Sequence, residues 1–170
     1  MATNVEIKAR VRCWGRLLER SEQVADGPPS RLEQVDTFFV VPRGRLKLRV
    51  QEPGRGELIH YHRPDDAGPK ASEYHIVATD DPDGLAAMLG AALGVAGEVR
   101  KTRLVYLCGQ TRIHLDEVVG LGQFMELEVV LEPGQPQSRG EAEARRLMEA
   151  LEIEQGDLLQ GAYFDLLQSP

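Results

Sequence analysis

The chain has 170 residues, 42% hydrophobic content and a formal net charge of −7. Its length suits one domain that buries a core without disulfide support. The negative charge argues against a non-specific nucleic-acid binder, because affinity for a phosphate backbone comes from a cationic surface. No apolar run approaches the roughly 20 residues of a membrane span, and the N-terminus leads directly into charged residues rather than a secretory signal. Cys13 and Cys108 do not have the spacing of zinc ligands. Two scattered thiols in a chain of this size fit a reducing compartment better than an oxidising one, so we expect a cytoplasmic protein.

Alternation of apolar and polar residues predicts the strands. In chain order they are 3–12, 34–41, 45–52, 56–63, 72–79, 97–108, 111–117 and 123–132. Short Gly- and Pro-containing turns join several of them, which favours an antiparallel sheet, and eight strands are enough to close a barrel. The predicted class is α+β and dominated by strands.

Helices are predicted at 14–24, 80–93, 138–153 and 157–168. Asp81 followed by Pro82 is typical of a helix start, and Ser138 with Glu141 has capping-box spacing. The Pro-, Gly- and Gln-rich stretch 132–140 separates the last strand from the C-terminal helices. We therefore expect one domain over 1–170, with the strands in 1–132 and the C-terminal helices in 138–168.

The polar faces of these strands are almost entirely ionisable, with arginine prominent. An ordinary solvated face accounts for any one strand, but such faces usually mix charged residues with Ser, Thr and Gln. If the sheet closes, the charged face lines the lumen, where charge is tolerable only beside water or a charged ligand. The cations are Lys8, Arg10, Arg45, Lys47, Arg49, Arg63, Lys101, Arg103 and Arg112, and the carboxylates are Glu6, Asp116, Glu126 and Glu128.

Cations beside clustered carboxylates match the needs of a metal-bound polyphosphate. Arginine binds phosphate oxygens in a bidentate manner, and carboxylates supply the oxygen ligands that Mg²⁺ or Mn²⁺ requires. By the same alternation His114 faces the lumen, whereas His60 and His62 face outward. The charge pattern alone leaves the solvated sheet and the ligand-binding barrel open.

The stretch Asn4-Val5-Glu6-Ile7-Lys8 resembles the E-x-E-x-K signature of the CYTH superfamily of triphosphate tunnel enzymes, which groups class IV adenylyl cyclases with thiamine triphosphatases and other triphosphatases. Similar blocks follow in order: QVDTFF (34–39), GRLKLR (44–49), ELIHYHRPD (57–65), KTRLVY (101–106), TRIHLDEVVGLGQFMELE (111–128) and YFDLL (163–167). Taken together, these stretches are most similar to those of proteins grouped with class IV adenylyl cyclases. The resemblance implies an eight-stranded antiparallel β-barrel with flanking helices and a charged interior.

The resemblance also implies roles for individual residues. Metal ligands for Mg²⁺ or Mn²⁺ would be Glu6, Asp116, Glu126 and Glu128, which together with Lys8 form the catalytic set. The substrate-binding residues would be Lys8, Arg10, Arg45, Lys47, Arg49, Arg63, Lys101, Arg103 and Arg112, with Lys70 in a segment similar to a mobile lysine-bearing segment near the tunnel mouth. Tyr61 or a metal-bound water is a candidate general base.

The implied substrate is a small-molecule triphosphate: ATP, inorganic triphosphate or thiamine triphosphate. The family uses the scaffold either as a hydrolase or as a cyclase that directs the ribose 3′-hydroxyl of ATP at the α-phosphorus. A non-catalytic polyphosphate-binding module and a barrel whose polar face is merely solvated remain as alternatives. The sequence leaves open whether the chain is a monomer or a homodimer.

Asn4 departs from the signature, which has Glu at this position. An amide is a neutral ligand, so one negative charge is missing from the implied metal site. Three consequences stay open: weaker metal binding, a changed substrate, or a chain that binds better than it turns over.

Overall fold

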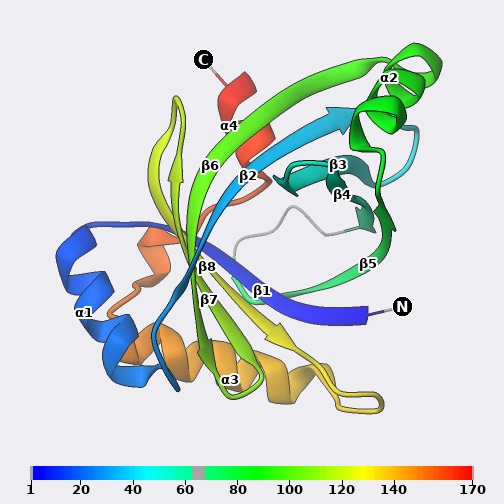
Figure 1. Ribbon diagram of the computed structural model, residues 1–170. Coiled ribbons are helices and arrows are strands. Elements are labelled where there is room, and N and C mark those ends of the chain that lie inside the picture. Colours follow the sequence, from blue (N-terminus) through cyan, green and yellow to red (C-terminus); the bar gives the residue numbers. More distant parts are fainter. Residues whose placement is uncertain (1, 63–67, 170) are drawn as a thin grey trace.

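The computed structural model describes residues 2–62 and 68–169, and within them eight strands close an antiparallel β-barrel (Figure 1). The strands are β1 (Ala2–Arg10), β2 (Ser30–Phe39), β3 (Arg45–Glu52), β4 (Arg55–His62), β5 (Lys70–Thr79), β6 (Val95–Cys108), β7 (Thr111–Val118) and β8 (Gly122–Val130). Their order around the barrel is β1-β5-β4-β3-β2-β6-β7-β8. The predicted barrel is confirmed, and the predicted strands differ from the observed ones only at their ends.

The first strand closes the barrel. β1 pairs with β5 on one side and with β8 on the other, so that Glu6 lies opposite Glu128 and Lys8 lies opposite Glu126. Because side chains alternate between the two faces of a strand, this register turns the charged residues of β1 and β8 inward together.

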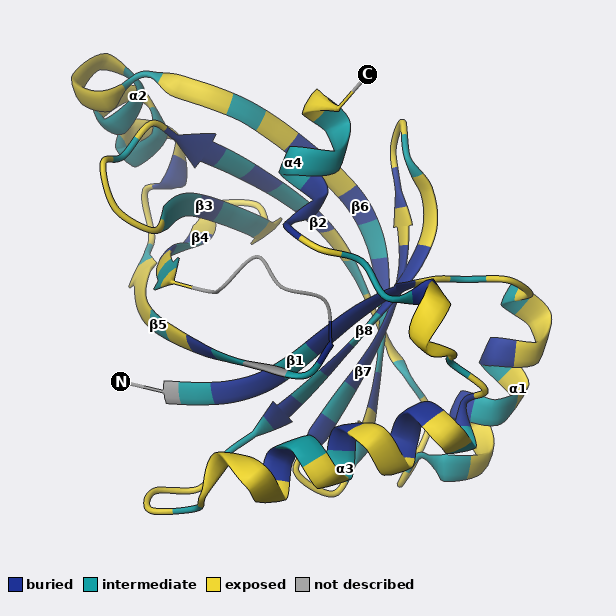
Figure 2. Ribbon diagram, turned by 180° about the vertical axis from the view of Figure 1, so that it is seen from behind, coloured by how far each residue is buried: buried dark blue, intermediate teal, exposed yellow. Residues whose placement is uncertain are grey.

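The main hydrophobic core lies outside the barrel, between its wall and two helices. The outward-facing Ile7, Leu115 and Leu127 pack against Leu17 of α1 (Trp14–Val24) and Leu147 of α3 (Gln137–Ala150). Figure 2 shows α3 running along this side of the barrel, with buried residues on the face that meets the strands. Because much of the apolar burial occurs on the outside, the lumen can hold many charged side chains.

The two predicted helix starts have different outcomes. α2 (Pro82–Leu93) begins as expected, with the Asp81 side chain accepting a hydrogen bond of 2.9 Å from the Gly84 amide. The capping box predicted from Ser138 and Glu141 is wrong, because α3 begins directly after Pro136 and no side chain caps it. The fixed φ of proline suits a helix start. Because the helix begins at Gln137, Ser138 already lies inside its first turn and cannot be the N-cap.

The single helix predicted over 157–168 is also wrong. A short 3₁₀ turn (Gln155–Asp157) is followed by an extended segment and then by α4 (Tyr163–Gln168). The extended segment runs beside β1, where Leu158 bridges Ala9 and the Leu159 amide donates to the Lys8 carbonyl at 2.9 Å. Gly161 then adopts a φ of 75°, a conformation that a helix interior does not allow.

α4 covers one end of the barrel. Phe164 stacks on Phe38 of β2 with ring centroids 5.0 Å apart, and Tyr163 packs on Phe124 of β8. Val99 of β6 joins the same apolar cluster. No helix in the described part of the chain has the length and apolar character to cross a membrane.

Candidate functional site

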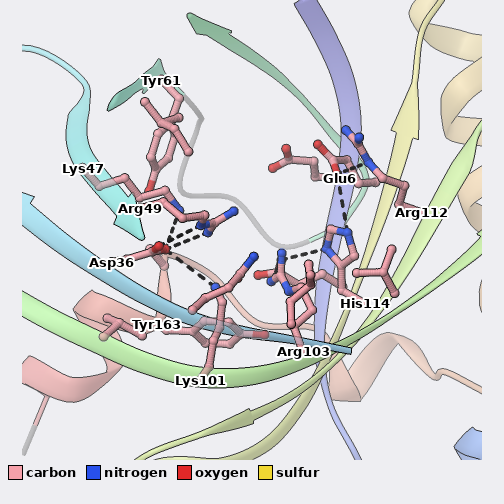
Figure 3. Close-up of a pocket in the computed structure, with 18 of the residues that line it drawn as sticks. Glu6, Asp36, Lys47, Arg49, Tyr61, Lys101, Arg103, Arg112, His114 and Tyr163 are labelled. Carbon is pink, nitrogen blue, oxygen red and sulfur yellow. Dashed lines mark hydrogen bonds and ion pairs between the residues drawn. The ribbon is translucent and has the colours of Figure 1, made fainter. Parts of the chain in front are cut away.

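The barrel encloses a cavity of about 540 Å³ to which every strand contributes side chains, together with Tyr163 (Figure 3). Its charged lining consists of the cations Lys8, Lys47, Arg49, Lys101, Arg103 and Arg112 and the carboxylates Glu6, Asp36, Glu57, Glu126 and Glu128. Most of the residues predicted from strand alternation therefore meet in one cavity.

Arg103 of β6 stands at the centre of the charged wall. Its guanidinium donates two hydrogen bonds to Asp116, of 2.7 and 2.6 Å, and a third to Glu126 at 2.9 Å. The Tyr163 hydroxyl also donates to Asp116, at 2.7 Å. Asp116 is 0% exposed and lies behind Arg103 rather than on the cavity wall. Burial alone would raise the pKa of Asp116, but Arg103 lowers it, so this carboxylate anchors the guanidinium.

A second group of charges is centred on Asp36, a residue that the sequence reasoning missed. Asp36 is 1% exposed and accepts hydrogen bonds from Lys47 at 2.9 Å and from both nitrogens of the Arg49 fork at 2.7 Å, with Lys101 3.8 Å away. Burial would raise the pKa of Asp36, yet these cations lower it well below its ordinary value. Burial lowers the pKa of Lys47 to about 8. Positions 34 and 36 share one face of the predicted strand and both carry polar side chains. This pattern could have identified Asp36 as a residue facing the lumen.

The third group lies where β1, β7 and β8 meet. Lys8 is 3.2 Å from Glu126, and Arg112 donates to Glu128 at 2.8 Å. Asn4, which is fully buried, donates a hydrogen bond from its amide nitrogen to Glu128. Burial would raise the pKa of Glu126, but Lys8 and Arg103 lower it well below its ordinary value. Asn4 therefore orients a carboxylate that an acidic residue at position 4 would repel.

His114 faces the lumen, as predicted, and lies between two carboxylates. Its Nδ1 is 3.6 Å from Glu126 and its Nε2 is 3.7 Å from Glu128. Burial, followed by the charge of Arg103, lowers the pKa of His114, which favours the neutral imidazole near neutral pH.

Two of the predicted substrate-binding residues lie away from the described lining of the cavity, and two others lie wholly or partly outside the described part of the chain. Arg10 is exposed, 6.0 Å from the Phe124 ring, and Arg45 forms an ion pair with Asp165 of α4; neither belongs to the described lining of the cavity. Arg63 lies outside the described residues. Lys70 begins β5 opposite Glu6, and its side chain also lies outside the described part.

Tyr163 is a further residue that the sequence reasoning did not single out. Its ring lies 3.9 Å from the Lys8 ammonium and 5.1 Å from that of Lys101, while its hydroxyl binds Asp116. Burial and the nearby carboxylates raise the pKa of Tyr163 well above its ordinary value. The only sequence signal that linked this part of the chain to the site was the family-like block YFDLL (163–167).

The chemistry of the donors at β1 and β8 fits a divalent cation. Glu6 faces Glu128 across an antiparallel pair, and like charges directly opposite one another are destabilising unless a cation compensates them. Glu126 lies next along β8, and carboxylate oxygens are the ligands that Mg²⁺ and Mn²⁺ prefer. Across the described residues, no three His, Cys, Asp or Glu side chains converge as a metal cluster. A metal bound here would compete with the ammonium and guanidinium groups that now contact Glu126 and Glu128.

A closed barrel with cations and carboxylates facing its lumen defines the class of tunnel protein to which this chain belongs. The chain is a member of the CYTH domain family, whose model matches residues 2–163. A comparison with functionally curated proteins finds no significant match.

Solved structures share this fold at low sequence identity. The PH1012 protein from Pyrococcus horikoshii OT3 has a TM-score of 0.86 and 20% identity over 96% of this chain and 99% of that chain. A candidate adenylate cyclase from Vibrio parahaemolyticus has a TM-score of 0.79 and 21% identity over 98% of each chain. A candidate adenylyl cyclase from Hippeastrum, described as having a dominant triphosphatase activity, has a TM-score of 0.64 and 16% identity over 99% of this chain and 95% of that chain.

Proposed function

We propose that this protein is an enzyme that cleaves a triphosphate inside the barrel with the help of Mg²⁺ or Mn²⁺. The observation that carries the proposal is the meeting of two chemistries on one cavity wall. Lys8, Arg103 and Arg112 supply positive charge, and Glu6, Glu126 and Glu128 place beside them carboxylates of the kind that Mg²⁺ and Mn²⁺ prefer as ligands.

The proposed reaction is a direct attack on phosphorus without a covalent intermediate on the protein. Lys8, Lys101 and Arg103 would bind phosphate oxygens and stabilise the charge that develops on them in the transition state. Asp36 and Asp116, each buried beneath its cations, hold those cations in place before the substrate arrives. Glu6, Glu126 and Glu128 would hold the metal, and its charge would offset that of the phosphate oxygens.

The nucleophile decides the product. Water attacking the terminal phosphorus releases phosphate, whereas a ribose 3′-hydroxyl attacking the α-phosphorus releases pyrophosphate and a cyclic nucleotide. The names of the Vibrio and Hippeastrum proteins include both reactions, so both belong to the proposal. The charged wall would serve either reaction.

A non-catalytic polyphosphate-binding module is the second candidate. The observation that favours it is the state of the carboxylates, since Glu128 is already bound by Arg112 and by the neutral Asn4. In that case the cations would still bind a triphosphate, but the carboxylates would serve only to position them.

The test is a substrate panel with the purified protein. ATP, inorganic triphosphate and thiamine triphosphate are incubated with Mg²⁺ or Mn²⁺, and phosphate, pyrophosphate and cyclic AMP are quantified. Metal-dependent release of phosphate, or of cyclic AMP with pyrophosphate, supports the enzyme. Calorimetric binding of a triphosphate without any turnover would instead favour the binding module.

A further inference from the structure

Three of the four histidines of the chain lie on the outer face of two neighbouring strands. His60 and His62 flank Tyr61 on β4, and His75 follows Tyr74 on β5. Both tyrosines line the cavity. Because successive side chains of a strand point to opposite faces, the three histidines point away from the lumen, and all three are exposed.

The antiparallel register brings these side chains together. His60 lies directly opposite His75, and two positions along the same face His62 lies directly opposite Glu73. The Cβ atoms of directly opposite residues are about 4.5–5.5 Å apart. Two imidazoles at that separation can reach one ion, since a Zn–N bond is about 2.0–2.1 Å long. We call His60, His62, Glu73 and His75 the outer histidine patch.

The ring of His60 is oriented as a metal ligand requires. Its Nε2 lies 3.1 Å from the Arg43 carbonyl oxygen, which can only accept, so Nε2 carries a proton. In the neutral ring Nδ1 then keeps its lone pair. Metal-binding histidines commonly donate from their other ring nitrogen to a carbonyl in this way. Gly44 leaves room for the ring, because a Cβ added there would lie 3.0 Å from Nε2.

The rest of the patch is accessible. Across residues 2–62 and 68–169, no hydrogen bond or ion pair engages the side chains of His62, Glu73 or His75. Figures 1 and 2 both place β4 and β5 on the side of the barrel away from α1 and α3. The folded protein therefore uses these imidazoles for no contact that would compete with an ion.

We propose that the outer histidine patch binds Zn²⁺ or another late first-row divalent cation across β4 and β5. His60 through Nδ1, together with His75 and His62, supplies imidazole ligands, and Glu73 lies beside them as a carboxylate. Three imidazoles and a water form a known tetrahedral zinc arrangement. Imidazole suits Zn²⁺, Cu²⁺ and Ni²⁺, whereas Mg²⁺ and Mn²⁺ prefer oxygen. The patch thus differs from the lumen in chemistry and in face, and it does not depend on the proposed function.

Ion binding requires a rearrangement of side chains but not of strands. In the described residues no three His, Cys, Asp or Glu side chains converge as a metal cluster, so the rings must turn toward one another. Exposed side chains change rotamer on the picosecond-to-nanosecond timescale, while the backbone register that pairs these residues stays fixed. A bound ion would tie β4 to β5 on the outside of the barrel.

The experiment titrates the metal-stripped protein with Zn²⁺ in a calorimeter, with Mg²⁺ in excess. We expect His75→Gln to weaken Zn²⁺ binding at least about tenfold, since even the outer partners of metal ligands are worth 10–100-fold. Val77→Gln introduces the same side chain on the same face of β5 and should leave the Kd unchanged. His114→Gln, which removes the one histidine of the lumen, should also leave it unchanged.

Nitrogen-15 spectra of the imidazoles identify the ligand atoms. We expect Zn²⁺ to shift Nδ1 of His60 and a ring nitrogen of His75, and to leave the nitrogens of His114 in place. Zn²⁺ should also raise the Tm of the wild type but not that of His75→Gln, because an ion that binds only the folded state stabilises it.

Three outcomes would overturn the inference. The first is a wild type without saturable Zn²⁺ binding, and the second is a Kd that survives both His60→Gln and His75→Gln. The third is a Zn²⁺-dependent shift confined to His114, which would place the ion in the lumen. All of these measurements are made without substrate, so a failure here leaves the proposed triphosphate chemistry untouched, and the absence of turnover leaves the patch untouched.

Discussion

Glu126 is the residue at which the charge network and the proposed chemistry meet. Its carboxylate lies 3.2 Å from Lys8 and accepts a 2.9 Å hydrogen bond from Arg103. Replacing it by Gln keeps the shape but removes the charge that a metal requires. We expect Glu126→Gln to lower kcat at least about 100-fold, since even indirect changes around a metal ligand cost 10–100-fold. The Kd for inorganic triphosphate, measured by calorimetry, should change far less.

Glu57→Gln is the matched control for this prediction. Glu57 is also a cavity carboxylate, but it lies on β4, away from β1 and β8. Its replacement should leave kcat much closer to that of the wild type. If Glu126→Gln turned over substrate as fast as Glu57→Gln does, the assignment of Glu126 to the metal would be wrong.

Lys47 gives the site a pH dependence within an accessible range. Burial lowers its pKa to about 8, so the side chain is cationic at neutral pH and loses its charge as pH rises through that value. We expect binding of inorganic triphosphate to weaken between about pH 7 and about pH 9.5, by roughly tenfold, which is a typical loss for one charged hydrogen bond. Lys47→Arg keeps its charge throughout this range. The difference between the two Kd profiles isolates Lys47 from the titration of the ligand itself, and parallel profiles would contradict the assignment.

At the scale of elements, the C-terminal segment depends on one backbone conformation. Gly161 has a φ of 75°, and a Cβ added there would lie 2.9 Å from the Asp165 carboxylate. Its carbonyl also accepts a 3.2 Å hydrogen bond from Lys8. We expect Gly161→Ala to lower the free energy of unfolding by roughly 1–2 kcal/mol, the cost of a left-handed conformation for a residue with a side chain.

Gly156→Ala provides the comparison for this prediction, because nothing lies within 4 Å of a Cβ added at that position. Urea denaturation of both variants measures the difference directly. Equal stabilities would mean that the segment before α4 tolerates a side chain at Gly161, and that this turn does not fix the helix over the end of the barrel.

The same segment shows which parts of the secondary structure cannot be predicted from the local sequence. Strands such as β3 and β8 were predictable because an alternating pattern is local and needs no knowledge of the partner strand. The extended run after Gln155–Asp157 was not, since its conformation depends on Ala9 and Lys8, which lie far away in the sequence.

Alternation likewise predicts which way a charged residue faces but not what it contacts. Asp116 shares a face with the cavity residues Arg112 and His114, yet Arg103 and Tyr163 occupy its oxygens. Arg45 lies two positions before Lys47 and so shares its face of β3, yet Arg45 forms an ion pair with Asp165 instead of lining the cavity. Roles that depend on a partner from another element therefore emerge only from the three-dimensional arrangement.

For the whole molecule, the charged lumen makes the free energy of unfolding depend on pH, whereas the main hydrophobic core lies between the barrel wall and the helices. The pKa values of Asp36, Asp116 and Glu126 are all lowered in the folded protein, chiefly because cations outweigh the effect of burial. A carboxylate with a lowered folded pKa contributes its full stability above its ordinary pKa of about 4, and this contribution is lost as pH falls toward the folded value. The barrel should therefore weaken in acid even though its main hydrophobic core, as described, contains no carboxylate.

Asp36→Asn separates this contribution from the others. At neutral pH the variant leaves Lys47, Arg49 and Lys101 without their buried counter-ion, and removing one partner of such a group costs about 3–5 kcal/mol. Because Asn does not titrate, the variant lacks the part of the acid dependence that comes from position 36. We expect the unfolding free energies of the wild type and Asp36→Asn, measured in urea from about pH 7 down to about pH 3, to converge as the pH falls. Curves that stayed parallel would show that the pKa of Asp36 is the same in the folded and unfolded states, which would exclude it as the counter-ion on which the cations of the lumen depend.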